Sequence, residues 1–162
     1  MLKYLARRLL YSFRKDAVTI DALDNKQRNE ESDMGNIKAV FVGTGMIGAG
    51  LAANAMLNGY QTVLYDVVPH EKMRQNISHI LDILVGAGAA TREQADAALN
   101  ACHFSNDLED AVKGANFVQE CIPERLELKK STYATIQKVT GPDAIICSST
   151  SKLFPTKLQE GS

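Results

Sequence analysis

The sequence lacks long apolar runs, paired cysteines and a strong net charge, the features that mark membrane, disulfide-rich and nucleic-acid-binding proteins. Its 162 residues contain no Trp, three Cys and four Pro, and no apolar run approaches the roughly 20 residues that a membrane-spanning helix needs. Cys102, Cys121 and Cys147 form no Cys-x-x-Cys pair, so we predict reduced packing residues and no metal site. A net charge of −1 supplies no basic field for nucleic acid. The composition therefore indicates a globular domain without stable membrane insertion.

Charge is distributed unevenly at the start of the chain. Residues 1–15 carry five basic residues and no acidic one, and residues 24–33 contain no apolar residue. We predict a leader and flexible linker over residues 1–35 and a folded domain over residues 36–162. Three interpretations of the basic stretch stay open: a leader that belongs to no fold, a mitochondrial transit peptide, and a helix on a membrane surface. We expect a cytoplasmic protein, or a mitochondrial matrix protein if the stretch is a transit peptide.

Strand and helix patterns alternate after residue 36. Short β-branched and aromatic runs predict buried strands, and apolar residues at helical spacing predict the segments between them. Thr91 and Gln94 form a capping box at the start of one helix. Such alternation predicts an α/β fold, a Rossmann-type doubly wound parallel sheet with helices on both faces. The expected strands are 37–42, 62–65, 102–104, 116–119 and 144–147, and the main expected helices are 46–58, 71–85, 107–113 and 124–139.

A glycine motif links the first strand to the first helix. Gly43 permits a tight turn, Gly45 lets the backbone approach a pyrophosphate, and Gly48 lets the helix pack closely on the strand. At the start of the helix, Met46 and Ile47 offer free backbone N–H groups to the phosphates. A G-x-G-x-x-G pattern in this position predicts a dinucleotide site.

An acidic residue stands where the second strand ends. Asp66 follows Gly43 by 23 residues, which is the place of the carboxylate that binds the adenosine ribose hydroxyls. Its charge repels a 2′-phosphate, and Val67 and Val68 after it offer no arginine to bind one. The sequence therefore predicts NAD as the cofactor, in preference to NADP.

Two polar segments follow the fourth and fifth strands. Glu124 and Lys129 lie where the carboxyl edge of the sheet meets a helix, so they either contact one ligand or belong to a solvated helix face with Glu127. The hydroxyl run Ser148-Ser149-Thr150-Ser151 either binds a substrate oxygen or nicotinamide, or caps the next helix.

The elements VGTGMIG, VLYD, FVQECIPERLELK and ICSSTS occur in this order in one known family. Over roughly residues 36–160 the chain resembles the NAD-binding half of the 3-hydroxyacyl-CoA dehydrogenases, and it is most similar to the carnitine 3-dehydrogenase and lambda-crystallin (gulonate dehydrogenase) branch. The resemblance implies an NAD-dependent oxidoreductase that oxidises the 3-hydroxy group of a small-molecule substrate. It also implies that Glu124 and Lys129 contact the cofactor and that Ser151 is the active-site serine that hydrogen-bonds the 3-oxygen.

The chain also departs from the family pattern. The family places a general-base His after the hydroxyl run, and then a helical domain that completes the substrate site and the homodimer. His70, His79 and His103 all precede that run, and we expect His79 to pack or cap a helix. We therefore expect a sheet incomplete at its C-terminal side, a truncated domain, and no activity from this chain alone.

The substrate class can be narrowed by charge. Coenzyme A needs cations for its 3′-phosphate, and the region after the second strand offers only Lys72 and Arg74 before Arg92. This scarcity favours a small carnitine-like or gulonate-like hydroxy acid over a hydroxyacyl-CoA. The alternative to an enzyme is a non-catalytic NAD-binding or crystallin-like module.

Overall fold

A computed structural model describes residues 36–153 and 155–159, all of which lie in the second of the two units into which the chain divides, Ser32–Ser162. The predicted leader and linker, and the localisation that depends on them, fall outside these residues. No helix within the described ranges is long and apolar enough to cross a membrane.

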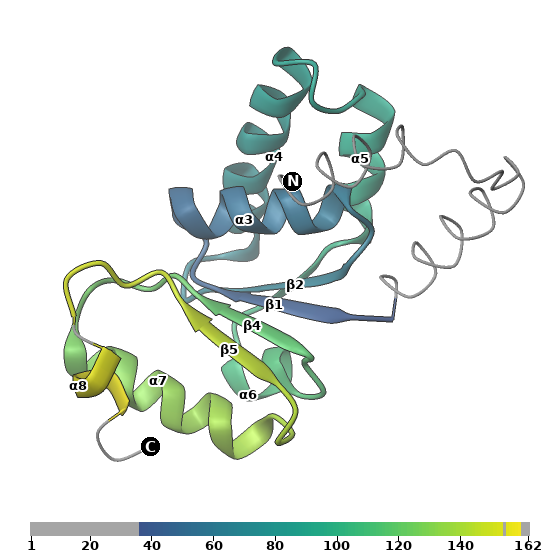
Figure 1. Cartoon of the computed structure of the whole chain (residues 1–162). Helices are drawn as coiled ribbons and strands as arrows, with labels where there is room; N and C mark the ends of the chain where they lie inside the picture. The colour runs from purple at the N-terminus through teal and green to yellow at the C-terminus, as the bar shows by residue number, and fades with distance from the viewer. Residues whose placement is uncertain (1–35, 154, 160–162) are drawn as a thin grey trace, which may run out of the picture. The chain divides into compact units, whose positions relative to one another are not determined.

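A five-stranded parallel sheet forms the centre of the domain (Figure 1). β1 (Lys38–Val42) lies between β2 (Gln61–Tyr65) and β4 (Phe117–Glu120), while β3 (His103–Ser105) and β5 (Ile145–Ser148) form the two edges. The strand order β3-β2-β1-β4-β5 confirms the predicted doubly wound sheet. The order reverses between β1 and β4, so the carboxyl ends of these two strands flank the crevice where ligands bind in this architecture.

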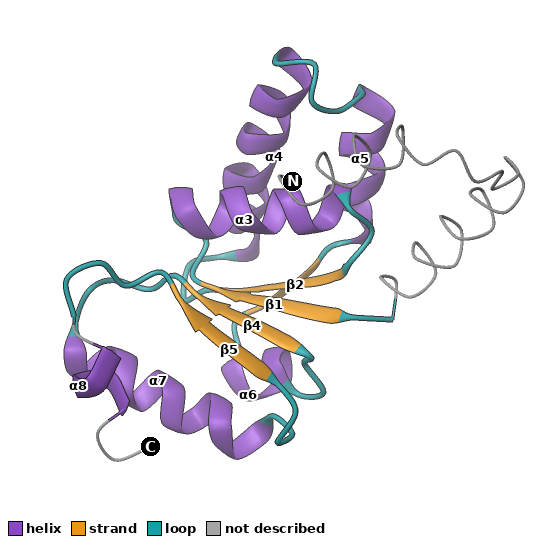
Figure 2. Ribbon diagram, in the orientation of Figure 1, coloured by secondary structure: helices purple, strands orange, loops and turns teal. Residues whose placement is uncertain are grey.

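Helices cover both faces of the sheet (Figure 2). Buried side chains of α3, α4 and α5 pack on one face, and those of α6 and α7 on the other. α8 packs against α7. The helices are α3 (Met46–Leu57), α4 (His70–Gly86), α5 (Arg92–Ala101), α6 (Leu108–Val112), α7 (Leu126–Val139) and α8 (Pro155–Gln159).

Double coverage explains why β1 is apolar in every residue after Lys38. Ala39 and Phe41 pack into the core beneath α3 and α4, while Val40 and Val42 pack into the core beneath α6 and α7. All four are buried, as expected of a central strand in a parallel sheet. On the edge strand β5, by contrast, Ile145 is 61% exposed.

The predicted boundaries hold within two residues, and the capping box of Thr91 and Gln94 is present. α7 begins at Leu126, two residues after the predicted start, and α8 was not predicted. His79 was expected to pack or cap, but it is exposed on α4. The three cysteines are free, and burial raises the pKa of the Cys102 thiol to about 12, so this group stays protonated.

Close packing of α3 on β1 depends on one glycine. A Cβ at Gly48 would lie 1.9 Å from the carbonyl oxygen of Gly43, whereas a Cβ at Gly50 would meet nothing within 4 Å. We predict that Gly48→Ala lowers the free energy of unfolding by about 1–3 kcal/mol or more through overpacking. Gly50→Ala, the matched control in the same helix, should raise it by roughly 0.5–1 kcal/mol because alanine favours the helix. Urea denaturation measures both, and equal effects would contradict the packing argument.

Candidate functional site

The glycine loop between β1 and α3 is built to receive an anion. Gly43 has a φ of 102°, and a Cβ there would meet the Cys121 carbonyl oxygen at 2.8 Å. Gly45 faces open space, with nothing within 4 Å of its Cβ position. α3 has no side-chain cap and no acidic residue in its first turn, so its first amides are open to a phosphate. The loop therefore fits a pyrophosphate.

Asp66 lies against this loop, as the motif predicts. Its Oδ2 accepts hydrogen bonds from the Thr44 amide and the Thr44 hydroxyl, each at 2.7 Å. Its Oδ1 accepts one from the Val67 amide at 2.7 Å. Val67 beside it is an exposed apolar residue. The phosphate loop and the predicted ribose-binding carboxylate thus form one hydrogen-bonded unit at the carboxyl ends of β1 and β2.

Glu124 holds the turn that follows β5. Its Oε1 accepts a hydrogen bond from the Ser151 amide at 2.6 Å, and its Oε2 accepts one from the Thr150 hydroxyl at 2.7 Å. The Ser151 hydroxyl is 3.5 Å from Oε1. These hydrogen bonds, the Ser151 amide first, lower the pKa of Glu124, so it is ionised at neutral pH. Glu124 and Ser151, predicted from separate segments, are in direct contact.

The hydroxyl run does not cap a helix, because α8 begins only at Pro155. Its side chains instead bond to groups at the end of β4 and in the loop that follows it. The Ser149 hydroxyl accepts a hydrogen bond from the side-chain amide nitrogen of Gln119 at 3.0 Å and lies 3.2 Å from the Cys121 sulfur. The turn after β5 is thereby fixed to the loop after β4.

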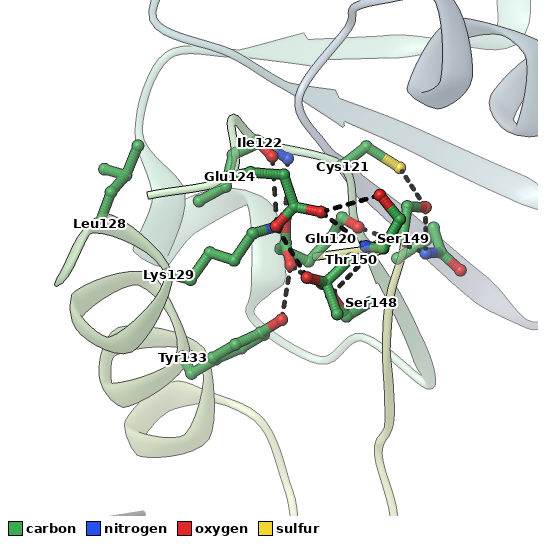
Figure 3. A network of polar contacts seen from close by, with 12 residues as sticks. Glu120, Cys121, Ile122, Glu124, Leu128, Lys129, Tyr133, Ser148, Ser149 and Thr150 are labelled. Carbon is green, nitrogen blue, oxygen red and sulfur yellow. Dashed lines mark hydrogen bonds and ion pairs between the residues drawn. The ribbon is translucent and has the colours of Figure 1, made fainter. Parts of the chain in front are cut away.

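A buried carboxylate that we did not single out from the sequence organises this region (Figure 3). Glu120, the last residue of β4, is inaccessible to solvent. Its Oε1 binds the Lys129 ammonium at 2.6 Å and accepts the Ile122 amide at 2.7 Å. Its Oε2 accepts the Ser148 hydroxyl at 2.6 Å and the Tyr133 hydroxyl. Four donors satisfy both oxygens, as a buried charge requires.

Lys129 belongs to the interior rather than to a solvated helix face. It is only 1% exposed, and its ammonium also donates to the Ile122 carbonyl oxygen at 3.2 Å. Glu124 Oε2 lies 3.9 Å from the same nitrogen. Lys129 therefore connects buried Glu120 with exposed Glu124. Because its ammonium is buried, its predicted role toward the cofactor depends on its contact with Glu124.

A signal for Glu120 was present in the sequence. Lys129 shares a helical stripe with Thr132 and Ile136, at spacings of three and seven, and all three are buried. A lysine on such a stripe needs a buried counter-charge. Glu120 lies two residues after Val118 and therefore on the same side of β4, which makes it the candidate partner.

The parallel sheet, its strand-order reversal and the glycine loop with Asp66 define a dinucleotide-binding domain of the Rossmann class. Residues 38–162 match the family model for the 3-hydroxyacyl-CoA dehydrogenase NAD-binding domain. The chain belongs to this family, and its cofactor is NAD.

Individual relatives agree with this assignment. An L-carnitine dehydrogenase of Pseudomonas sp. is 37% identical over 123 residues, which cover 75% of this chain and 37% of the relative. The human lambda-crystallin homolog is 34% identical over 125 residues, 75% of this chain and 39% of the relative. The structure of 3-hydroxybutyryl-CoA dehydrogenase from Escherichia coli matches with a TM-score of 0.67 at 29% identity, over 75% of this chain and 26% of that one. The chain thus spans less than half the length of these relatives.

Removing the buried charge at Glu120 should be costly. We predict that Glu120→Gln lowers the free energy of unfolding by about 3–5 kcal/mol, because Lys129 loses its buried counter-charge. Glu127→Gln, an exposed glutamate in the first turn of α7, is the matched control and should change little. Adding Lys129→Met to Glu120→Gln should recover part of the loss, since no uncompensated charge then remains. Urea denaturation measures all four proteins, and a double variant less stable than Glu120→Gln would contradict the ion-pair account.

Proposed function

We propose that this chain is the cofactor-binding half of an NAD-dependent dehydrogenase that oxidises the 3-hydroxy group of a small hydroxy acid. The observation that carries the proposal is that two ordered parts lie at the same carboxyl edge of the sheet. One is the glycine loop with Asp66, and the other is the hydroxyl turn bound to Glu124. NAD, when bound, accepts the hydride from the carbinol carbon.

Each predicted residue has a role in binding the cofactor. Gly45 leaves room for the pyrophosphate, while Gly43 permits the turn and Gly48 the close packing that place the loop. The amides at Met46 and Ile47 bind the pyrophosphate oxygens. The Asp66 carboxylate accepts a hydrogen bond from a ribose hydroxyl, and its negative charge disfavours a 2′-phosphate.

Glu124 completes the cofactor contacts, Lys129 contributes to them through Glu124, and Ser151 binds the substrate. Glu124 is exposed beside the turn and is held from below by the buried Lys129. The Ser151 hydroxyl donates a hydrogen bond to the 3-oxygen of the substrate, which steadies the carbonyl as it forms. The hydrogen bond from the Ser151 amide to Glu124 fixes the backbone that carries this hydroxyl.

A carnitine-like acid is a better candidate substrate than a coenzyme A thioester. In the α4–α5 region the Arg74 guanidinium donates to the Asn100 side chain, and Arg92 pairs with Asp82 at 2.8 Å and with Asp96 at 3.7 Å. These arginines have partners within the domain, so they are poorly placed to bind a 3′-phosphate. The similarity to L-carnitine dehydrogenase supports the same choice.

Turnover requires a general base that we infer is not among the residues described. His70 and His79 lie on α4, which follows β2, and His103 lies on β3. β3 and β5 are the opposite edges of the sheet, so these histidines lie away from the turn that carries Ser151. We propose that the base and the rest of the substrate pocket come from sequence of the kind that the relatives carry outside the matched region, in a homodimeric enzyme.

Cofactor preference tests the role of Asp66. We predict that the chain binds NADH more tightly than NADPH in isothermal titration calorimetry. Asp66→Ala should weaken NADH binding by about 1–3 kcal/mol, because a hydrogen bond to a charged group is lost, and should narrow the gap to NADPH. Equal affinities for the two cofactors in the unmutated chain would refute the assignment.

Activity tests the division of labour. We predict that the 162-residue chain forms no NADH from carnitine, gulonate or 3-hydroxybutyryl-CoA, because a missing general base removes a factor of about 10²–10⁴. A protein extended through the family's histidine and helical domain should form NADH from one of them, as followed by NADH absorbance. Substantial turnover by the short chain would reveal an unrecognised base, and His79→Ala and His103→Ala would then be the first variants to assay.

A further inference from the structure

Thr44, the variable residue between the first two glycines of the motif, has an unusual environment for a loop position. It is 1% exposed, and it donates twice to one atom, from its amide and from its hydroxyl to Asp66 Oδ2. A carboxylate oxygen accepts about two hydrogen bonds through its lone pairs. Thr44 therefore fills the acceptor capacity of Oδ2.

The other oxygen of Asp66 is differently placed. Within the described residues Oδ1 accepts one hydrogen bond, from the Val67 amide, so one of its lone pairs stays available. Two bonds on Oδ2 and one on Oδ1 fix the rotation of the carboxylate as well as its position. A glycine or alanine at position 44 would retain the amide bond alone and leave the carboxylate more freedom to turn.

Both partners of this contact are fixed by side chains from other elements: the loop of Thr44 by Asn76, and the segment of Asp66 by Asn106. The Asn76 side chain of α4 donates to the Thr44 carbonyl oxygen at 2.9 Å. The Asn106 side chain, just after β3, donates to the carbonyl oxygens of Asp66 at 2.6 Å and of Val68 at 2.8 Å. The hydroxyl of Thr44 is thus presented to Asp66 by a rigid frame.

We propose that Thr44 is a specificity-determining positioning residue. Its hydroxyl holds the Asp66 carboxylate so that Oδ1 is left as the acceptor for a ribose hydroxyl. The negative charge of the carboxylate then stays where a 2′-phosphate would enter. This inference rests on the proposed role of Asp66 in selecting NAD. Thr44 itself acts through Asp66, so its loss affects the choice between cofactors and not only their common affinity.

The test is isothermal titration of the full 162-residue chain with NADH and with NADPH. Thr44→Val keeps the shape and removes the hydroxyl, and we expect the ratio of the NADPH to the NADH dissociation constant to fall about fivefold, the size of one hydrogen bond. Thr44→Ser keeps the hydroxyl and should retain the wild-type ratio. If Thr44→Val does not fold, Thr44→Ala removes the hydroxyl without added bulk and provides the same measurement.

Thr62→Val is the matched control. Thr62 is a buried threonine near the amino end of β2, whose hydroxyl donates to the Tyr60 carbonyl oxygen at 3.0 Å. It should lose stability without any change in the cofactor ratio. A wild-type chain that prefers NADH, together with an unchanged ratio in Thr44→Val, would overturn the role of Thr44 alone. A wild-type chain without a preference would overturn the proposed function of Asp66, and the role of Thr44 with it.

Discussion

The buried ion pair between Glu120 and Lys129 is the constraint on which this half of the domain depends. A carboxylate and an ammonium removed from water are tolerated only when both are fully bonded. Glu120 accepts hydrogen bonds from four donors, which come from the loop after β4, from α7 and from β5. Those donors determine where the elements lie. α7 must turn Lys129 and Tyr133 toward the sheet, and β5 must end with Ser148 beside Glu120. Burial and the hydrogen bond to Glu120 raise the pKa of Tyr133, which keeps this phenol a donor.

A series of polar contacts leads from this ion pair to the surface. Lys129 lies between buried Glu120 and exposed Glu124, and Glu124 in turn binds the amide of Ser151. A substrate-binding hydroxyl on a free loop would lose entropy each time it was ordered for reaction. Here the order is established when the domain folds. At the carboxyl ends of β1 and β2, Thr44 and Asp66 form a second unit that hydrogen bonds hold in place, so the proposed cofactor and substrate contacts are both ordered before binding.

Much of the fold and of the candidate site could be predicted from the sequence, because the informative residues stand directly after the ends of strands. The fold requires a fixed spacing between the strands and the residues Gly43, Gly48 and Asp66. Glu124 and the hydroxyl run come after strands that end at the same edge of the sheet. Glu120 was not predicted, because a glutamate at the end of a strand is expected to be solvated until its partner Lys129 is recognised from the buried stripe of α7. That partner lies nine residues later on a helix, and the contact depends on how α7 rotates. The hydrogen bonds of Thr44 were not predicted for a different reason: a threonine in a loop carries no periodic pattern.

The register of the sheet has a consequence for protein engineering. Glu120 lies opposite Val42 on one side and Ser148 on the other, so a slip of one residue in either pairing would bring a neighbour of opposite orientation to the buried position. Chimeras that take the hydroxyl turn from one relative and β4 or α7 from another would combine a carboxylate with donors that did not evolve to meet it. The continuous segment from Phe117 to Lys152 contains the residues of this network, so exchanging it between family members as one piece keeps Glu120 and Glu124 with their own donors.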